Sequence, residues 1–348
     1  MKGHNIGDIL FFSALRLVSW LTVLLFVGML VFIGHLAWDA ISEKGISFWW
    51  GFEWNPPMDE FGAAPFIVGT LASSAIAVAI ATPISIGTAL FLREIAPRRI
   101  ASIAAFLVEL LAAIPSVVYG LWGVFVLAPL MRENIQPFLS KWFGPETYFA
   151  AALGHLLTAI AYPFLLVGDA LGFTQVTLSS LSAQMMAFSQ GVFDGAPLGL
   201  GLLTSGVVLA IMITPTVTAI SREVLLTVPD SVREAALGLG ATRWEMIRLA
   251  LLRTGRAGLV GAVILGLGRA IGETMAVTMV IGNRNEVPQS FFDPAQTMAS
   301  VIANEYNEAD GLHLSSLAFV GLSLFVISLI VNFTARLVIR YLDGKGKA

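Results

Sequence analysis

Cysteine is absent from the sequence, so disulfide bonds and thiolate metal sites are excluded and the redox state of the compartment leaves no signal. Charged residues are scarce: they make up 12% of the 348 residues, against about a quarter in soluble domains. The sequence also lacks a cluster of basic residues of the kind that binds nucleic acid. No lysine is followed by serine or threonine, so the phosphate-binding loop of many ATPases cannot occur. We therefore expect no nucleic-acid partner and no ATP bound through such a loop.

Long apolar runs dominate what is present. Hydrophobic residues make up 57% of the chain, and stretches of about twenty or more mostly apolar residues are each long enough to cross a bilayer as a helix. We therefore predict an all-α, polytopic membrane protein, surrounded by the lipid bilayer, with a single transmembrane domain over residues 1–348. The six predicted transmembrane helices are residues 17–38, 66–92, 101–130, 199–220, 257–282 and 314–335.

The basic residues indicate how these helices are oriented. With six spans, both termini lie on the same side of the membrane, and 15 of the 20 lysine and arginine residues fall on that side, against four on the other. Positive charge is enriched on the cytoplasmic side of membrane proteins, so we predict cytoplasmic N and C termini. The same rule makes residues 221–256, which carry six arginines, a cytoplasmic loop.

Residues 132–198 complicate this topology. Within them, residues 147–168 are uncharged and long enough to cross the bilayer. A single additional crossing would move the basic loop at 221–256 to the outside, which the charge rule disfavours. The segment therefore either lies against the membrane or pairs with residues 170–193 as a hairpin. We predict an external or membrane-associated insertion at 132–198 and six spans, with eight spans as the alternative.

Three prolines fall inside predicted spans, at Pro83, Pro115 and Pro215. Proline removes one helix hydrogen bond, so each position is either an ordinary kink or a broken helix of the kind that lines a transport pathway. Because proline is common in membrane helices, the kink is the favoured interpretation at each position taken alone.

Only three charged side chains lie within the predicted spans, and they are Glu109, Arg269 and Glu273. An ion at the centre of a bilayer costs about 2.5–3.5 kcal/mol on insertion scales, so these side chains must face protein or water. Arg269 lies at the midpoint of its span, and Glu273 follows at i+4, where the two can pair. The pair either fixes helix packing or belongs to a site that handles an anion, and charge within the membrane favours the second interpretation. Glu109 is either a second member of such a pathway or a carboxyl paired at a helix interface.

Small residues beside Arg269 predict close helix packing. Gly268 and Gly272 form a Gly-x-x-x-Gly pattern in the fifth predicted span. Such a pattern removes side chains from one helix face and lets a neighbouring helix approach closely.

The loop at 221–256 contains local helix signals. Residues 231–234 and 242–245 each match the capping-box pattern that starts a helix. Gly240 lies between them, where it can end the first helix in a left-handed conformation. We predict a short helix, a glycine turn and a second helix that runs into the fifth span. The first helix must dock on something, because isolated helices below about 12–15 residues are marginal in water.

This loop resembles the EAA loop of permease subunits in ATP-binding-cassette (ABC) importers. The resemblance rests on Glu234, Ala235, Ala236 and Gly240. In that family the loop helix inserts into a groove on a cytoplasmic ATPase subunit and transmits its closure to the membrane helices. Arg253 stands where the family has a proline that would break the chain before the fifth span. The resemblance implies an ATPase-docking surface made by Ser231, Glu234, Ala235, Ala236, Leu237 and Gly240.

Two longer motifs are similar to those of PstC-type permease subunits of phosphate importers. They read ELLAAIPSVVYGLWG at 109–123 and GLGRAIGETMAVTMVIGN at 266–283, with smaller matches at 303–305 and 311–313. The resemblance implies a type I ABC importer permease fold. It also implies the permease subunit of an ATP-driven importer of inorganic phosphate.

The resemblance carries further expectations. This chain would form half of a translocation pathway that includes Arg269, Glu273 and Glu109. A second, PstA-type permease subunit would complete the pathway as a heterodimer. Two copies of a cytoplasmic ATPase subunit and an extracytoplasmic phosphate-binding protein would be its other partners. The expected location is the bacterial plasma (inner) membrane, as a multi-pass protein.

No cofactor is expected in this chain itself. The four histidines are scattered without metal-ligand spacing, and no catalytic constellation is present, so we predict a transport subunit rather than an enzyme. ATP and Mg²⁺ would be bound by the partner ATPase. The alternatives are a secondary, ion-coupled anion transporter, an ABC permease for a different oxyanion, and a scaffold membrane protein. A secondary transporter should show inverted internal repeats, and none is visible.

Overall fold

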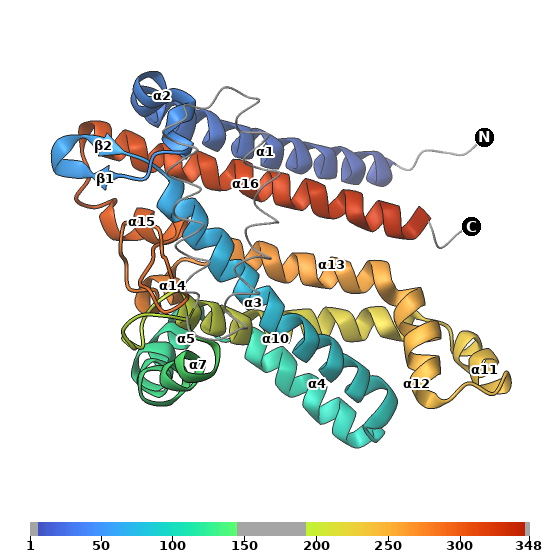
Figure 1. The fold of residues 1–348 in the computed structure, drawn as a ribbon. Coiled ribbons are helices and arrows are strands. Elements are labelled where there is room, and N and C mark those ends of the chain that lie inside the picture. The colour runs from blue at the N-terminus through green and yellow to red at the C-terminus, as the bar shows by residue number, and fades with distance from the viewer. Residues whose placement is uncertain (1–5, 145–192, 345–348) are drawn as a thin grey trace.

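The computed structural model describes residues 6–144 and 193–344, and these ranges are mainly helical (Figure 1). The segment 147–168, which decides between six and eight spans, lies outside the described residues. The α-helices are α1 (Ile6–Leu36), α2 (Trp38–Lys44), α3 (Ala64–Leu90), α4 (Arg98–Ala112), α5 (Ser116–Trp122), α6 (Ala128–Leu130), α7 (Gln136–Phe143), α10 (Leu202–Thr227), α11 (Asp230–Gly238), α12 (Arg243–Glu245), α13 (Leu252–Ile271), α14 (Met275–Val280), α15 (Met298–Glu305) and α16 (Gly311–Gly344).

Shorter elements connect the helices. Strands β1 (Trp54–Asn55) and β2 (Glu60–Phe61) pair antiparallel, with Trp54 opposite Phe61. Two 3-10 turns cover Gly45–Trp49 and Pro56–Met58. The π-helical turns are Phe91–Ile95, Gly123–Leu127, Met131–Ile135 and Met246–Leu251.

The helices confirm the predicted all-α, polytopic membrane fold. Within the described residues, five continuous helical stretches are long and apolar enough to cross a membrane, and one bent pair would make a sixth. The five stretches are Phe11–Leu36, Ala64–Ile95, Leu202–Thr227, Arg243–Ile271 and Gly311–Tyr341, and the bent pair is Arg98–Ala112 with Ser116–Phe143.

The segments predicted to be cytoplasmic gather at one end of the bundle. In Figure 1 the start of α1, the end of α16, the turn between α3 and α4, and the helices α11 and α12 all lie toward the right. The hairpin, α2 and α15 lie at the opposite end. The fold therefore groups the basic segments as the charge-based topology requires.

The central helix of the core is α10, which packs against α3, α13 and α4. Its side chains Val208, Leu209 and Met212 are fully buried in the main apolar cluster. Small residues let α3 come close: a Cβ at Gly206 would lie 2.5 Å from Cγ2 of Ile76. Close approach of this kind is how membrane helices gain contact area where lipid is as apolar as protein.

Helices α1 and α16 run side by side outside this core (Figure 1). The rings of Phe26 and Phe325 join them, with centroids 5.6 Å apart. Large apolar side chains elsewhere on α1 are exposed, including Leu17 at 71% and Trp20 at 72%. Such an apolar, uncovered surface suits contact with lipid rather than water.

The predicted span at 101–130 is not one straight helix, because α4 and the helical stretch Ser116–Phe143 that follows it are bent by 91° relative to each other. The cause is Pro115, which has no N–H to donate and keeps the preceding residue out of the helical conformation. Pro83 and Pro215, by contrast, lie inside α3 and α10 without interrupting them. The ordinary kink expected at Pro115 is therefore wrong, and the broken-helix alternative applies there.

The predicted span at 257–282 is broken as well. Helix α13 ends at Ile271, and residues 272–274 before α14 are not helical. At the other end the helix is longer than predicted, since helical turns continue from Arg243 to the end of α13 without a break. Arg253, in the place of the family's proline, lets the second helix of the loop run directly into the membrane.

Two glycines of α3 offer a matched test of this packing. A Cβ at Gly69 would overlap the backbone oxygen of Gln296, whereas a Cβ at Gly87 would meet no atom within 4 Å. We predict that Gly69→Ala lowers the melting temperature of the purified protein in detergent, because α3 must move away from the 296 backbone. Gly87→Ala should retain or raise stability, by up to about 1 kcal/mol, because alanine favours the helix. Equal melting temperatures in a thermal unfolding assay would contradict the close approach at Gly69.

Candidate functional site

Arg269 lies in the last turn of α13, half-buried against α10. Its Nη1 donates a hydrogen bond to Oγ1 of Thr216 on α10, at 3.4 Å. The two helices approach closely one turn earlier, at Gly266, where a Cβ would lie 2.5 Å from Cγ2 of Val217. This packing holds the guanidinium beside α10, directly before the break in the fifth span.

The predicted ion pair between Arg269 and Glu273 is wrong, because no ion pair joins them among the described residues. Since α13 ends at Ile271, Glu273 does not follow one helical turn further on the same face. Its Oε1 instead accepts a hydrogen bond from the backbone N–H of Ala276, at 3.2 Å, at the start of α14. Glu273 therefore accepts from the backbone instead of pairing with Arg269. The N–H groups of Arg269 that do not contact Thr216 can donate to an anion.

The half-helices that follow the two breaks, α5 and α14, pack against each other. Glycines permit the contact: a Cβ at Gly120 would lie 2.6 Å from Sδ of Met279, and one at Gly123 would lie 2.7 Å from Cγ1 of Val280. The motifs at 109–123 and 266–283 thus meet in space, although they lie far apart in the sequence.

Side chains satisfy backbone groups at both breaks. At the first, Oη of Tyr119 donates to the carbonyl oxygen of Leu111 at 2.8 Å. At the second, Glu273 accepts from the first turn of α14. Backbone groups that lose their helical partners inside a bilayer must find other partners within the protein. The two side chains supply such partners, so both breaks are compatible with a position inside the membrane. Transporters use interrupted helices of this kind around their substrate sites.

Gly268 and Gly272 do not pack against another helix in the described part of this chain. A Cβ at Gly268 would meet no atom within 4 Å, and one at Gly272 would meet only the Gly268 carbonyl. Gly266 is the residue that brings α13 close to α10. The packing role of Gly268 and Gly272 therefore stays a prediction.

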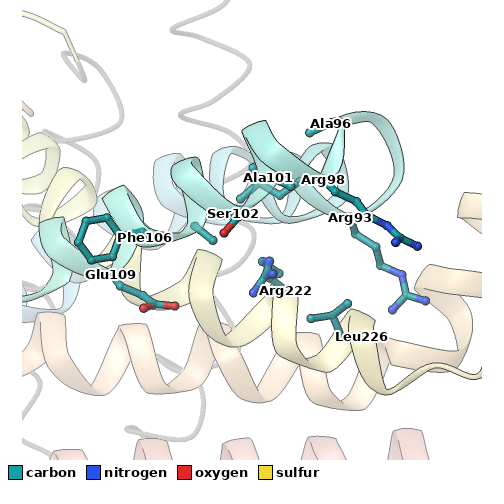
Figure 2. Close-up of a pocket in the computed structure, with 11 residues that line it drawn as sticks. Arg93, Ala96, Arg98, Ala101, Ser102, Phe106, Glu109, Arg222 and Leu226 are labelled. Carbon is teal, nitrogen blue, oxygen red and sulfur yellow. The ribbon is translucent and has the colours of Figure 1, made fainter.

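Glu109 is exposed on α4 and lines a cavity of about 450 Å³ between α4 and α10. Figure 2 shows its carboxylate directed toward α10, from which Arg222 enters the same cavity. The predicted loop at 221–256 includes Arg222. The structure extends α10 to Thr227 and so places this arginine on a membrane helix. Glu109 thus shares a cavity with Arg222, and it forms no ion pair with any described residue.

The loop's first helix starts differently from the prediction. Helix α11 begins at Asp230, directly after Pro229, and no side chain caps it, so the predicted capping box at 231–234 is wrong. Proline sets the backbone immediately before the helix, which puts the serine inside the first turn. The second predicted box is confirmed: Thr242 Oγ1 accepts from the Glu245 N–H at 3.3 Å, and the glutamate accepts from the Thr242 N–H at 2.8 Å.

Gly240 ends α11 in the left-handed conformation, as predicted, with φ of +86°. The N–H of Ala241 donates to the carbonyl of Ala236 at 3.1 Å, and the N–H of Gly240 donates to the carbonyl of Leu237 at 3.0 Å. These two bonds are the Schellman pattern, which closes a helix on a glycine.

The outward face of α11 is uncovered in this chain. Among the predicted docking residues, Ser231, Glu234, Ala235, Leu237 and Gly240 are exposed and Ala236 is half-buried. Leu239 and Trp244 beside them are 91% and 65% exposed. The inward face packs on the ends of α3, α10 and α13 through an apolar cluster of Ala89, Leu225, Val228, Leu251 and Leu259, which Val232 of α11 joins.

An ion network that sequence reasoning missed ties α11 to the turn after α3. Arg93 and Glu94 pair at 3.1 Å, with side chains only 6% and 4% exposed. Arg93 also donates to the carbonyl of Val228 at 3.3 Å and lies 3.7 Å from Asp230, while Glu94 lies 3.5 Å from Arg233. The network therefore links α11 directly to the turn at the end of α3.

At the opposite end of the bundle, Glu305 joins several elements. Its Oε2 accepts from Nε1 of Trp54 at 2.8 Å and lies 2.9 Å from Nε2 of His313. Its Oε1 accepts from Nδ2 of Asn285 at 3.3 Å. The two smaller motif matches thus lie in one polar cluster, which fastens the hairpin to α15 and α16.

A family model described as "binding-protein-dependent transport system inner membrane component" matches residues 81–344. The chain belongs to this family. As a member, it is a transport subunit embedded in a membrane. The matched region contains both helix breaks, Arg269 and the loop between α10 and α13.

Relatives of this family member extend the match over nearly the whole chain. A protein of Pasteurella multocida described as phosphate transport system permease protein PstC is 41% identical, over 98% of this chain and 94% of its own length. One of Mesorhizobium japonicum with the same description is 39% identical, over 99% and 94%. A chain of a solved bacterial alginate ABC transporter is 15% identical with a TM-score of 0.50, over 94% of this chain and 92% of its own, and that likeness shows the fold alone. The predicted resemblance to PstC-type permeases is confirmed.

The buried ion network provides a test of how the loop is anchored. Glu94→Gln removes the counter-charge of Arg93 and Arg233, and breaking a buried pair of this kind costs about 3 kcal/mol. We predict a lower melting temperature and faster protease cleavage between α11 and α12. Glu133→Gln is the control, because its pair with Arg132 is exposed and contributes about 0–1 kcal/mol. Equal stability of the two variants would show that the network does not anchor the loop.

Proposed function

We propose that this chain is the transmembrane permease subunit of an ATP-driven ABC importer for inorganic phosphate and forms half of its translocation pathway. The observation that carries the proposal is the match over nearly the whole chain to relatives described as PstC phosphate permeases. Arg269 supports it, as a half-buried arginine inside a predicted span with no carboxylate partner among the described residues.

Arg269 has the chemistry that a tetrahedral oxyanion requires. Its planar guanidinium group can donate two parallel hydrogen bonds to such an anion. It lies at the midpoint of the predicted fifth span, beside the break that opens the helix. Glu273 places negative charge close by, which would keep binding weak enough for release. Glu109, in the cavity between α4 and α10, would belong to the same pathway nearer the cytoplasm.

The partners follow from the surfaces that this chain leaves uncovered. The exposed face of α11 would dock on one of two copies of a cytoplasmic ATPase subunit, which would bind ATP and Mg²⁺. A PstA-type permease would pair with this chain as a heterodimer and complete the pathway. An extracytoplasmic phosphate-binding protein would deliver substrate to the end that carries the hairpin and α15. The complex would lie in the bacterial inner membrane, with both termini of this chain in the cytoplasm.

Movement of α11 would act on the helices around Arg269 through two structural connections. One is the apolar cluster that joins α11 to α13, which continues without interruption from Arg243 to Ile271. The other is the buried pair of Arg93 and Glu94, which ties α11 to the end of α3. ATP-driven closure of the partner could therefore reposition α13 against α10.

The role of Arg269 can be tested by transport. In cells that depend on this chain for phosphate uptake, Arg269→Gln should lower uptake of radiolabelled phosphate about 100-fold, because charged hydrogen bonds to the anion are lost. Arg269→Lys keeps the charge without the fork and should retain part of the activity. Arg132→Gln, at an exposed position, should transport normally. Normal uptake by a correctly inserted Arg269→Gln protein would refute the assignment.

The docking surface can be tested separately. Leu237→Asp puts a charge on the exposed face of α11, so the ATPase should no longer co-purify and ATP-dependent uptake should stop. Met58→Asp is the matched control for co-purification of the ATPase, because it adds the same charge at a 71% exposed position at the opposite end of the bundle. ATPase binding that survives Leu237→Asp would contradict the surface. Uptake that continues without any ATPase would favour a secondary transporter.

A further inference from the structure

A cavity between α3, α4 and α10 collects three arginines. Arg93 comes from the π-helical turn after α3, Arg98 from the start of α4 and Arg222 from α10. In Figure 2, Arg93 and Arg98 lie toward one end of this cavity, Arg222 lies in the middle and Glu109 lies toward the other end. The function proposed above gives Arg98 and Arg222 no role.

Part of this positive charge has no counter-ion in the described chain. Arg98 forms no ion pair with any described residue, and Arg222 pairs only with Glu223, at 3.1 Å. Arg93 pairs with Glu94 and lies near Asp230 through its other nitrogens, but its Nη1 is buried and has no hydrogen-bond partner among the described residues. A buried charged donor without an acceptor is rare in folded proteins unless a ligand, water or ion supplies the acceptor.

Glu109, the acidic residue that lines the cavity, lies far from Arg98. Arg98 and Glu109 are both on α4, and their separation along the helix axis is about 16 Å, at 1.5 Å per residue. The carboxylate therefore neither neutralises the arginine end of the cavity nor strongly repels an anion there.

The backbone contributes to the same end. Helix α4 has 15 residues, begins at Arg98 after Pro97, and has no side-chain cap. Its first N–H groups and the positive end of its dipole therefore favour an anion. The hydroxyl of Ser102, one turn on, also lines the cavity and can donate a hydrogen bond.

We propose that this cavity is a second anion site, which binds a phosphate group through Arg98 and Arg222, with Arg93 as the buried cation behind them. Its volume exceeds that of one phosphate ion, so it accepts a hydrated ion or the phosphate of an anionic lipid headgroup. The cavity lies at the end of the bundle that carries the α3–α4 turn and α11. If the proposed function holds, that end is cytoplasmic, where imported phosphate is released and where anionic headgroups lie.

The experiment uses the full chain, purified with the subunits that accompany it, in nanodiscs of zwitterionic phosphatidylcholine. All variants carry Arg269→Gln, so that the proposed pathway site does not contribute. One arm measures binding of radiolabelled inorganic phosphate at constant ionic strength. The other adds phosphatidylglycerol and measures retained lipid by native mass spectrometry. The variants are Arg98→Gln, Arg222→Gln and the pair, with Arg99→Gln as control, because this neighbouring arginine does not line the cavity.

The Arg98→Gln, Arg222→Gln pair should weaken binding at least about tenfold in one arm, whereas Arg99→Gln should bind as the parent does. Loss confined to the phosphate arm identifies the free ion, and loss confined to the lipid arm identifies a headgroup. If neither probe binds, or if the pair and the control bind equally, the proposal is wrong. If the double variant fails to fold, Arg98→Gln alone is compared with Arg99→Gln, because Arg98 is exposed and its substitution should not disturb the core. Because the readout is binding rather than uptake, this result is independent of whether the chain imports phosphate.

Discussion

The burial of α10 is the constraint on which the rest of the structure depends. Two thirds of its apolar membrane-spanning stretch is buried inside this one chain. That share is larger than in any other candidate span of the described residues. Each functional element packs on it: Thr216 holds Arg269, Arg222 faces the cavity with Glu109, and Leu225 lies in the cluster beneath α11. Because each residue of a helix advances it by about 1.5 Å, these three positions on α10 keep fixed spacings along the helix axis.

The two broken helices show how polar backbone is accommodated within an apolar chain. Pro115 ends α4, and the Tyr119 hydroxyl returns to the Leu111 carbonyl, while the Glu273 carboxylate accepts from the start of α14. In a bilayer no water would satisfy these groups, so the side chains are required for the breaks to exist at all. The half-helices α5 and α14 then pack through Gly120 and Gly123, which brings two distant motifs together.

The departure from the family's loop pattern has a mechanical consequence. With Arg253 in place of proline, helical turns continue from Arg243 to Ile271, so the second helix of the loop and the arginine site belong to one continuous helical stretch. The buried pair of Arg93 and Glu94 couples the same loop to the end of α3. Both connections converge on α10, against which α3 and α13 pack. The cytoplasmic loop is therefore linked to the site by rigid helices rather than by flexible chain.

Sequence by itself determined the features that arise within a few residues. The apolar runs defined the membrane helices, the basic residues grouped the loops, and Gly240 and Thr242 with Glu245 marked a helix end and a helix start. These signals are readable because backbone conformation and capping depend on neighbours three or four residues away. The capping box predicted at 231–234 failed because Pro229 precedes the helix, and α11 begins at Asp230, two residues before the start that a cap at Ser231 would give.

Only the tertiary structure decided which side chains meet. An i+4 spacing pairs Arg269 with Glu273 only if the helix continues, and the helix ends between them. The packing of α10 decided that Gly266 rather than Gly268 makes the close approach, and that Arg222 shares a cavity with Glu109. Asp230 and Arg233 of α11, the partners of Arg93 and Glu94, likewise lie more than 130 residues further along the chain. Such contacts depend on how whole helices rotate and cross, which no local pattern encodes.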